Sequence, residues 1–284
     1  MSENKEQEWF IAAELPVIFS DLLTRFEEFA PLLASTDPTQ NILSPRSGSD
    51  VPSETIPLSS SLRDDHVKGH IKMKGTLITK TELSIEINNT PVPIKTVASI
   101  KEEEHNPWRL CQLGHAANYM FYVKQKCEDI AKGKVTDIGL AKRALDFVLD
   151  QIKRCKLQLV LPRQDVATTF DRNYCVFSPE LPPGVLVNFH IKDIKLVLTI
   201  SCLKNPQDLH VKDKYSLPKN AYCDRTIMLN VHWMTDIYDK LTLLQNEIQL
   251  VYQKLSVFTL APPHICKPVN DAVGEAIHSC CEIK

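Results

Sequence analysis

Side chains that commonly bind zinc gather near the end of the sequence. Two histidines and three cysteines occur within residues 264–281, namely His264, Cys266, His278, Cys280 and Cys281. Structural zinc sites usually draw their ligands from two short motifs, with about two to five residues between the members of each pair. Here a His-x-Cys pair is followed by eleven other residues and then by His-x-Cys-Cys, which fits no common zinc spacing. We therefore expect no metal site and interpret residues 262–284 as a loosely packed tail.

Motifs of the familiar enzyme classes do not occur in the sequence. Its 8 glycines form neither a Gly-x-Gly-x-x-Gly fingerprint nor a Gly-Lys-Ser/Thr phosphate loop. Neither the Gly-x-Ser-x-Gly of serine hydrolases nor the His-Glu-x-x-His of zinc proteases is present. His115 and His232 fall in or beside predicted helices, where packing is the commoner role of a histidine. We predict no catalytic residue and no cofactor-binding residue, and thus a protein that is not an enzyme.

Charge and cysteine content restrict the partners and the compartment. The chain has 33 Lys and Arg against 35 Asp and Glu, a net charge of -2, whereas nucleic-acid binders carry a basic excess. No signal sequence opens the chain, and no apolar run approaches the roughly 18 residues of a membrane-spanning helix. We expect a cytoplasmic protein with no nucleic-acid partner and no direct membrane insertion, in which the nine cysteines are reduced.

Four segments show the apolar spacing of amphipathic helices. They are residues 8–33, 108 to about 133, 138 up to Pro162, and about 231–260. Pro16 lies inside the first segment and indicates either a kink or the first turn of the main helix. Thr136 or Asp137 is a suitable N-cap for the third segment, which Pro162 ends. The fourth has apolar residues alternately three and four apart, which favours packing in a helical bundle. These bundle-seam residues are Met234, Ile237, Leu241, Leu244, Ile248, Val251, Leu255 and Phe258.

Two other regions show the period of two that is typical of half-buried strands. One begins at Val67, and the other runs from Val185 to Cys202 with a hairpin turn near Lys192-Asp193. Residues 35–62 contain four prolines and eight serines and have neither period, so we interpret 35–64 as a disordered loop.

The predicted fold class is α+β: an antiparallel helical bundle plus a separate antiparallel β domain, with the chain crossing between them. The bundle would comprise residues 1–34, 105–162 and 231–261, and the β domain residues 65–104 and 163–230.

Several stretches, in this order and spacing, resemble one known family. The first stretch is Asp65–Gly69, which leads into strands, and the second is Trp108–Leu110, which opens a helix that continues with His115–Asn118. The third is Phe177–Pro182, which is followed by the strand segments Leu186–Ile191 and Leu196–Thr199. The last is Trp233-Met234, which precedes the long helix that ends with Lys254–Phe258. Over about residues 8–260 the chain resembles the Rogdi family, which includes the smaller regulatory subunit of the RAVE complex. The loop 35–62 and the tail after Pro262 have no counterpart in that pattern.

The resemblance implies a non-catalytic scaffold or adaptor that promotes assembly of the vacuolar proton-pumping ATPase. The implied partners are a large WD-repeat subunit of the rabconnectin type, a Skp-type adaptor and soluble-sector subunits of the pump. It also implies peripheral recruitment to vacuolar or endosomal membranes. Trp9, Trp108 and Trp233 are our candidate interaction residues, because aromatic side chains are enriched at binding hot spots. For each of them, partly buried packing is the alternative and the commoner role.

Two alternatives from other classes stay open. The first is a leucine-zipper-type dimeric interaction protein with a nuclear pool, although residues 205–230 lack the basic region that a DNA-binding zipper needs. The second is a cryptic metalloenzyme that uses the histidines and cysteines of the tail.

Overall fold

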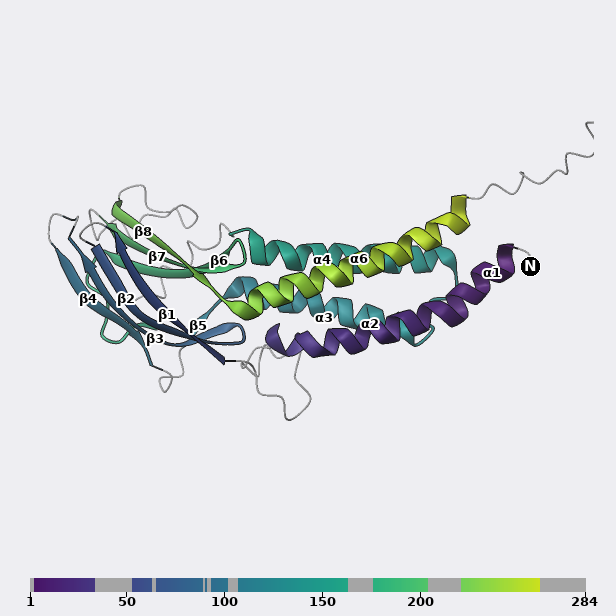
Figure 1. The fold of residues 1–284 in the computed structure, drawn as a ribbon, viewed down its shortest axis with the longest axis horizontal. Helices are drawn as coiled ribbons and strands as arrows, with labels where there is room; N and C mark the ends of the chain where they lie inside the picture. Colours follow the sequence, from purple (N-terminus) through teal and green to yellow (C-terminus); the bar gives the residue numbers. More distant parts are fainter. Residues whose placement is uncertain are drawn as a thin grey trace, which may run out of the picture.

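Helices and strands occupy opposite ends of an elongated molecule (Figure 1). The structure, a computed structural model, describes residues 3–33, 53–62, 65–88, 90, 93–101, 107–162, 176–203 and 221–260. One end is an antiparallel helical bundle and the other consists of two antiparallel sheets, which the chain visits twice. The α+β fold class is therefore confirmed.

The bundle is built from helices far apart in the sequence. Its first rod is α1 (Glu3–Trp9), the π-helical segment η1 (Phe10–Glu14), α2 (Leu15–Phe29) and the 3₁₀ turn η2 (Ala30–Leu33). Then follow α3 (Cys111–Ala131), α4 (Ile138–Val160) and α6 (His232–Leu260). α3 packs between α2 and α4, and α4 also packs against α6. α2 and α4 run towards the sheets, whereas α3 and α6 run away from them (Figure 1).

Pro16 falls in the first turn of α2, one of the two positions expected for it. The turn before it is widened, because the N–H of Leu15 donates to the carbonyl of Phe10 five residues back. Pro16 has no N–H and would crowd the carbonyl of a regular preceding turn. The π-helical segment relieves that conflict, so the rod continues past the proline.

The ends of α4 are fixed by specific hydrogen bonds. Asp137 is its N-cap, as one of the two expected candidates, and its carboxylate accepts the N–H of Leu140 at 2.8 Å. At the other end, the N–H groups of Asp193 and Ile194 donate to the carbonyls of Val160 and Leu159 at 2.9 and 2.8 Å. A hairpin turn of the β region thus caps a bundle helix, which joins the two parts of the molecule.

The two sheets differ in size. The larger has the order β1-β2-β3-β4, from β1 (Ser53–Leu62), β2 (Asp65–Lys74), β3 (Leu77–Ile87) and β4 (Ile94–Ile100), and the short β5 (Trp108–Arg109) also pairs with β3. The smaller has the order β6-β7-β8, from β6 (Val185–Lys192), β7 (Lys195–Leu203) and β8 (Ala221–Asn230). All paired strands are antiparallel.

The structure corrects the interpretation of residues 35–64 as a disordered loop. Residues 53–62 form β1, which pairs with β2 along its whole length. Ile56 and Leu58 are buried, whereas Thr55, Pro57 and Ser59 are exposed. Since β1 pairs only with β2 within the sheet, Pro57 can lie in this edge strand without removing a ladder hydrogen bond on its free side. Residues 108–109, expected in a helix, are also in a strand, β5.

One apolar core runs from the bundle into both sheets. A single cluster of buried side chains includes Phe19 of α2, Leu145 of α4, Ile71 of β2 and Leu198 of β7. Within the described ranges, no helix is both long and apolar enough to span a membrane. The tail 262–284, with its histidines and cysteines, lies outside the described residues, as do residues 204–220.

Candidate interaction surfaces

The three candidate tryptophans have different environments. Trp9 is 56% exposed, but Trp108 and Trp233 are only 3% and 7% exposed. The ring of Trp108 packs against Phe189 and Phe177, with centroid distances of 5.4 and 6.2 Å. Trp108 and Trp233 therefore have the packing role that was the alternative to an interaction role, and both fill the region where helices meet sheets. Of the three, Trp9 is the one accessible to a partner.

The seam of α6 faces the interior of its own bundle. Seven of the predicted seam residues are buried: Met234, Ile237, Leu241, Leu244, Ile248, Val251 and Leu255. Phe258 is partly buried and packs against Phe10, with ring centroids 5.8 Å apart. The carbonyl of Phe258 also accepts a hydrogen bond from Gln7 at 2.8 Å. The heptad spacing is thus used for packing within the chain.

Long polar side chains close both flanks of this seam. On the α2 side, Arg25 pairs with Glu247, and Lys254 pairs with Glu14 at 3.4 Å. On the α4 side, Lys156 donates to the side chain of Gln245 at 3.1 Å and lies over the ring of Tyr238. The exposed pairs contribute little stability individually, but they cover the apolar seam with long side-chain stems.

A buried amide fixes the smaller sheet to the bundle. Gln112, in the first turn of α3, is 5% exposed. Its side-chain oxygen accepts the N–H of Ile191 at 2.7 Å, and its nitrogen donates to the carbonyls of Ile191 and Leu161 at 2.8 and 3.0 Å. One side chain therefore joins α3, the end of α4 and β6, in a geometry that only one orientation of these elements satisfies.

A buried ion pair joins the two sheets. Asp65 of β2 is 2% exposed and accepts from Nε of Arg225 of β8 at 2.7 Å and from its terminal nitrogen. The other oxygen of Asp65 accepts the N–H of Asn88 at 2.8 Å. At the other end of β1, the exposed His232 at the start of α6 lies 2.8 Å from the carboxylate of Glu54. This hydrogen bond raises the pKa of His232 above its usual value.

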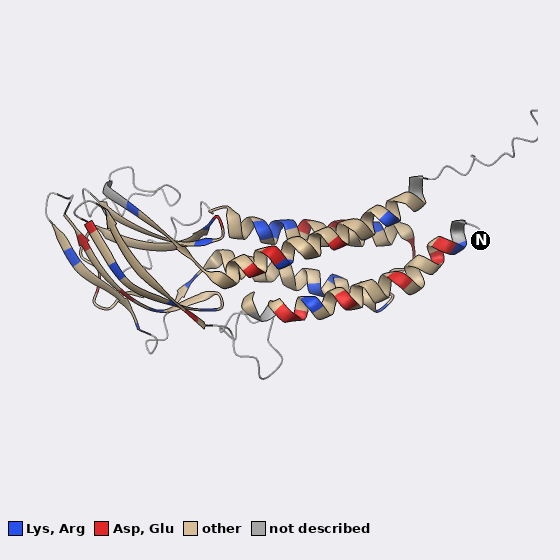
Figure 2. Cartoon of the chain, viewed as in Figure 1, with Lys and Arg blue, Asp and Glu red and all other residues tan. Residues whose placement is uncertain are grey.

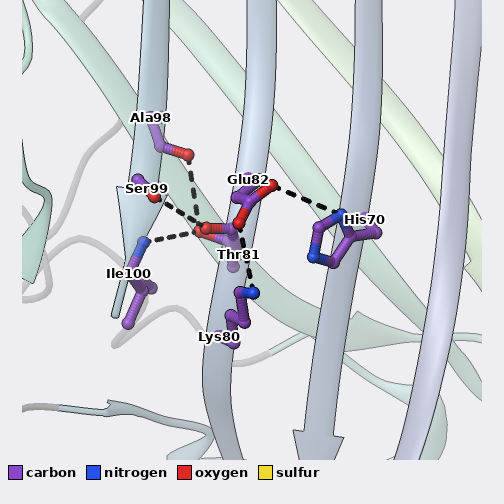
Figure 3. A network of polar contacts seen from close by, with 7 residues as sticks. All are labelled: His70, Lys80, Thr81, Glu82, Ala98, Ser99 and Ile100. Carbon is purple, nitrogen blue, oxygen red and sulfur yellow. Dashed lines mark hydrogen bonds and ion pairs between the residues drawn. The ribbon is translucent and has the colours of Figure 1, made fainter. Parts of the chain in front are cut away.

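The outer face of the larger sheet is polar and internally paired (Figure 3). Glu82 of β3 lies between Lys80, at 3.2 Å, and His70 of β2, at 3.9 Å. On the core-facing side of the same strand, the fully buried Thr81 accepts the N–H of Ile100 of β4 through its hydroxyl, at 3.1 Å. The hydroxyl of Ser99 donates to the carbonyl of Thr81, also at 3.1 Å. These contacts stabilise strand pairing, and the geometry resembles an ordinary solvated sheet face rather than a reactive site.

A groove lies on the outside of the bundle between α3 and α4. Its volume is about 470 Å³. Tyr122, Leu140 and Phe147 line it and are 49%, 39% and 41% exposed, and Lys126 and Arg143 add positive charge. More broadly, basic side chains outnumber acidic ones on α4, whereas α3 has two of each and α1 and α2 are mainly acidic (Figure 2). Exposed apolar side chains rimmed by charge are typical of interaction surfaces.

The environments of Cys127 and Cys155 are those of structural cysteines and not of reactive ones. Cys127 and Cys155 are buried in the bundle, and burial raises the pKa of Cys127 to about 12 and that of Cys155 further still. Buried neutral thiols of this kind behave as small apolar side chains. Among the residues that the structure describes, no group of histidines, cysteines or carboxylates is placed to hold a metal ion.

Comparison with known proteins gives one family. The family described as "Rogdi leucine zipper containing protein" matches residues 6–227. The chain is 24% identical over 204 residues to "Protein rogdi" of Drosophila melanogaster, covering 69% of this chain and 69% of that protein. It is 22% identical over 200 residues to "Protein rogdi homolog" of Danio rerio, covering 69% of this chain and 66% of that protein. The family match includes both sheets up to β8 and ends before α6 begins.

Proposed function

Because the chain belongs to the Rogdi leucine zipper family, we propose that it is a non-catalytic scaffold of a RAVE-like complex. In this role it promotes assembly of the vacuolar proton-pumping ATPase. It binds a large WD-repeat subunit and a Skp-type adaptor and presents the remaining surface to soluble-sector subunits of the pump. It acts in the cytoplasm and is recruited peripherally to vacuolar or endosomal membranes.

The match over residues 6–227 carries this proposal. The Rogdi family is not known as an enzyme family. The architecture supports a scaffold, since Gln112 and the Asp65–Arg225 pair hold the bundle and sheets in one fixed arrangement. A scaffold needs such rigidity because partners bound at different ends must keep a defined spacing.

Affinity purification from the organism's own cells, followed by mass spectrometry, tests the proposal. We expect the tagged full chain to recover a giant WD-repeat protein together with soluble-sector pump subunits. The bait must elute as a single folded species, and an Ile248→Asp variant, which breaks the seam, serves as a misfolded control. Recovery of neither partner class by the folded bait would contradict the proposal.

A dimer formed through the α6 seam is not favoured. Leu244 is 6% exposed and Ile248 is fully buried within the chain's own bundle, so they have almost no surface to offer a second copy. Light scattering distinguishes the two states, because a seam-mediated dimer would be dissociated by Leu244→Asp into folded monomers. We expect instead that Leu244→Asp destabilises the monomer itself.

A further inference from the structure

The α3–α4 groove has the size and lining of a site for one more helix. Leu140 and Phe147 are one heptad apart on α4, and Tyr122 faces them from α3. Seven helical residues rise about 10.5 Å, so the apolar strip is two turns long. Side chains on the surface of a bundle are usually polar, but these three are 39–49% exposed.

The charges around the groove are unbalanced. Asp129, the one acidic residue in its lining, is bound to Lys134 at 2.7 Å, and this hydrogen bond lowers the pKa of its carboxyl. Lys126 and Arg143 also line the groove, and neither forms an ion pair within the described part of the chain. An occupant helix with an apolar face and a net negative charge would complement this surface.

The sequence after α6 contains such a pattern. Apolar residues recur three and four apart at Val269, Ala272, Val273, Ala276, Ile277 and Cys280. Asp271 and Glu275 lie one helical turn apart in the same stretch. From Val269 to Ile277 a helix would rise about 12 Å, close to the length of the groove. Residues 268–283 contain three acidic residues and no lysine or arginine.

The position at which this segment leaves the bundle also fits. α6 ends far from the sheets, at the end of the bundle where α3 connects to α4 (Figure 1). Asp129 and Leu140, which flank that connection, line the groove. The seven residues 261–267 span up to about 23 Å when extended. This length crosses about two helix diameters, which is the width of the bundle.

We propose that residues 268–283 bind in the α3–α4 groove of the same chain as a short amphipathic helix. Val269, Val273 and Ile277 cover Tyr122, Leu140 and Phe147. Asp271 and Glu275 lie on the opposite face of such a helix, so the negative charge of the segment acts on Lys126 and Arg143 at a distance and not through direct ion pairs. The bound segment covers this surface and competes with any partner helix that uses it. This inference is independent of the proposed role in pump assembly.

Photo-cross-linking in the full chain tests the inference. Benzoylphenylalanine replaces Gln125, an exposed residue in the groove lining, and a second chain carries it at the exposed Leu243 of α6 as a control. After irradiation, mass spectrometry identifies the linked tryptic peptides. We expect position 125 to link to residues 268–284 with at least a ten-fold higher yield than position 243. A mixture of ¹⁵N-labelled and unlabelled chains should give links within one chain only.

Charge and apolar variants sharpen the test. Arg143→Glu should lower the yield from position 125 several-fold, and Glu275→Arg in the same chain should restore it. Phe147→Asp should abolish the link, whereas Val17→Asp, at an exposed apolar residue of α2, should not change it. Circular dichroism establishes whether each variant is folded. If Phe147→Asp is not folded, the test rests on Arg143→Glu and on its combination with Glu275→Arg. Links between labelled and unlabelled chains, no link to 268–284, or an unchanged yield in Arg143→Glu would overturn the inference.

Discussion

The seam of α6 and the joint at Gln112 are both buried, but they are held by opposite kinds of contact. Leu241 and Ile248 in the seam are fully buried and bring only apolar surface to the bundle core. Gln112 is similarly buried, yet its amide makes hydrogen bonds to backbone groups of two other elements, the end of α4 and β6. The same contrast separates the bundle core from the Asp65–Arg225 pair between the sheets.

The difference indicates that buried apolar contacts and buried polar contacts determine different properties of the fold, namely its stability and the orientation of its parts. Apolar burial supplies most of the stability but has little directionality, so it drives the helices together without fixing how the sheets are oriented. A buried polar group is costly unless its partners are in place, so Gln112 and Asp65 favour one arrangement over the others. We expect substitutions in the seam to be sensitive to volume, and substitutions at the joints to be sensitive to hydrogen-bonding groups.

The largest effect is expected from removing one partner of the buried ion pair. Arg225→Ala removes the cation that faces the buried carboxylate of Asp65, while the N–H of Asn88 still donates to that carboxylate. Loss of one member of a buried pair typically costs about 3–5 kcal/mol. Urea denaturation followed by circular dichroism measures the change in the free energy of unfolding. Arg25→Ala, which breaks the exposed pair with Glu247, is the matched control and should cost less than about 1 kcal/mol. Equal losses of unfolding free energy in the two variants would contradict a larger contribution from the buried pair between the sheets.

The seam should respond to volume. Leu241→Ala removes a fully buried side chain and should lower the free energy of unfolding by about 2–5 kcal/mol. Leu241→Met keeps most of the volume and should cost less than about 1.5 kcal/mol. Leu243→Ala, at the exposed neighbouring position, should have almost no effect. Similar costs for Leu241→Ala and Leu241→Met would contradict a seam governed by packing.

The contrast between α6 and β1 shows which elements could be predicted from the sequence. α6 packs one face against its own bundle, so its apolar residues recur at helical spacing through eight positions and mark the helix clearly. Among the β1 side chains that the structure describes, residues 53–61, Ile56 and Leu58 are the buried ones, and Pro57 and several serines lie between and after them. An edge strand tolerates such residues because one side of its backbone is unpaired. The sequence pattern that could have indicated this strand is the alternation of Ile56 and Leu58 with Thr55, Pro57 and Ser59.

The joints and the groove could not be predicted in the same way. Gln112 and Asp65 have partners 79 and 160 residues away in the sequence, and no local period reports such a contact. The tryptophans are similar, because Trp108 is buried by Phe177 and Phe189 from a distant segment. In the sequence, Leu140 and Phe147 look like ordinary helix residues. They form a groove only because the fold places Tyr122 of α3 beside them. Sequence patterns identify elements, whereas sites between elements depend on tertiary packing.

The Gln112 joint should respond to chemistry at constant volume. Gln112→Met keeps the length of the side chain but leaves the N–H of Ile191 without its acceptor. A buried donor left unsatisfied costs about 1–3 kcal/mol. Gln151→Met in α4 is the control, since the amide of Gln151 donates to Asp150 beside it and joins no second element. We expect the Gln112 variant to lose several times more free energy of unfolding than the Gln151 variant, and equal losses would contradict a role in orientation.

The smallest effect is expected at the exposed joint between α6 and β1, and it should depend on pH. The hydrogen bond from His232 to Glu54, the charge of Glu54 and, more weakly, that of Asp236 raise the pKa of His232 in the folded chain. A raised pKa means that protonated His232 stabilises the fold below its unfolded pKa of about 6.5, and that this contribution is lost as the pH rises through the folded pKa. His232→Gln should therefore lower the thermal midpoint at pH 6 but not at pH 8.5. Glu54→Gln should remove the same pH dependence, because it removes the cause of the raised pKa. A His232→Gln effect that is equal at both pH values would mean that the contact acts through neutral hydrogen bonding alone.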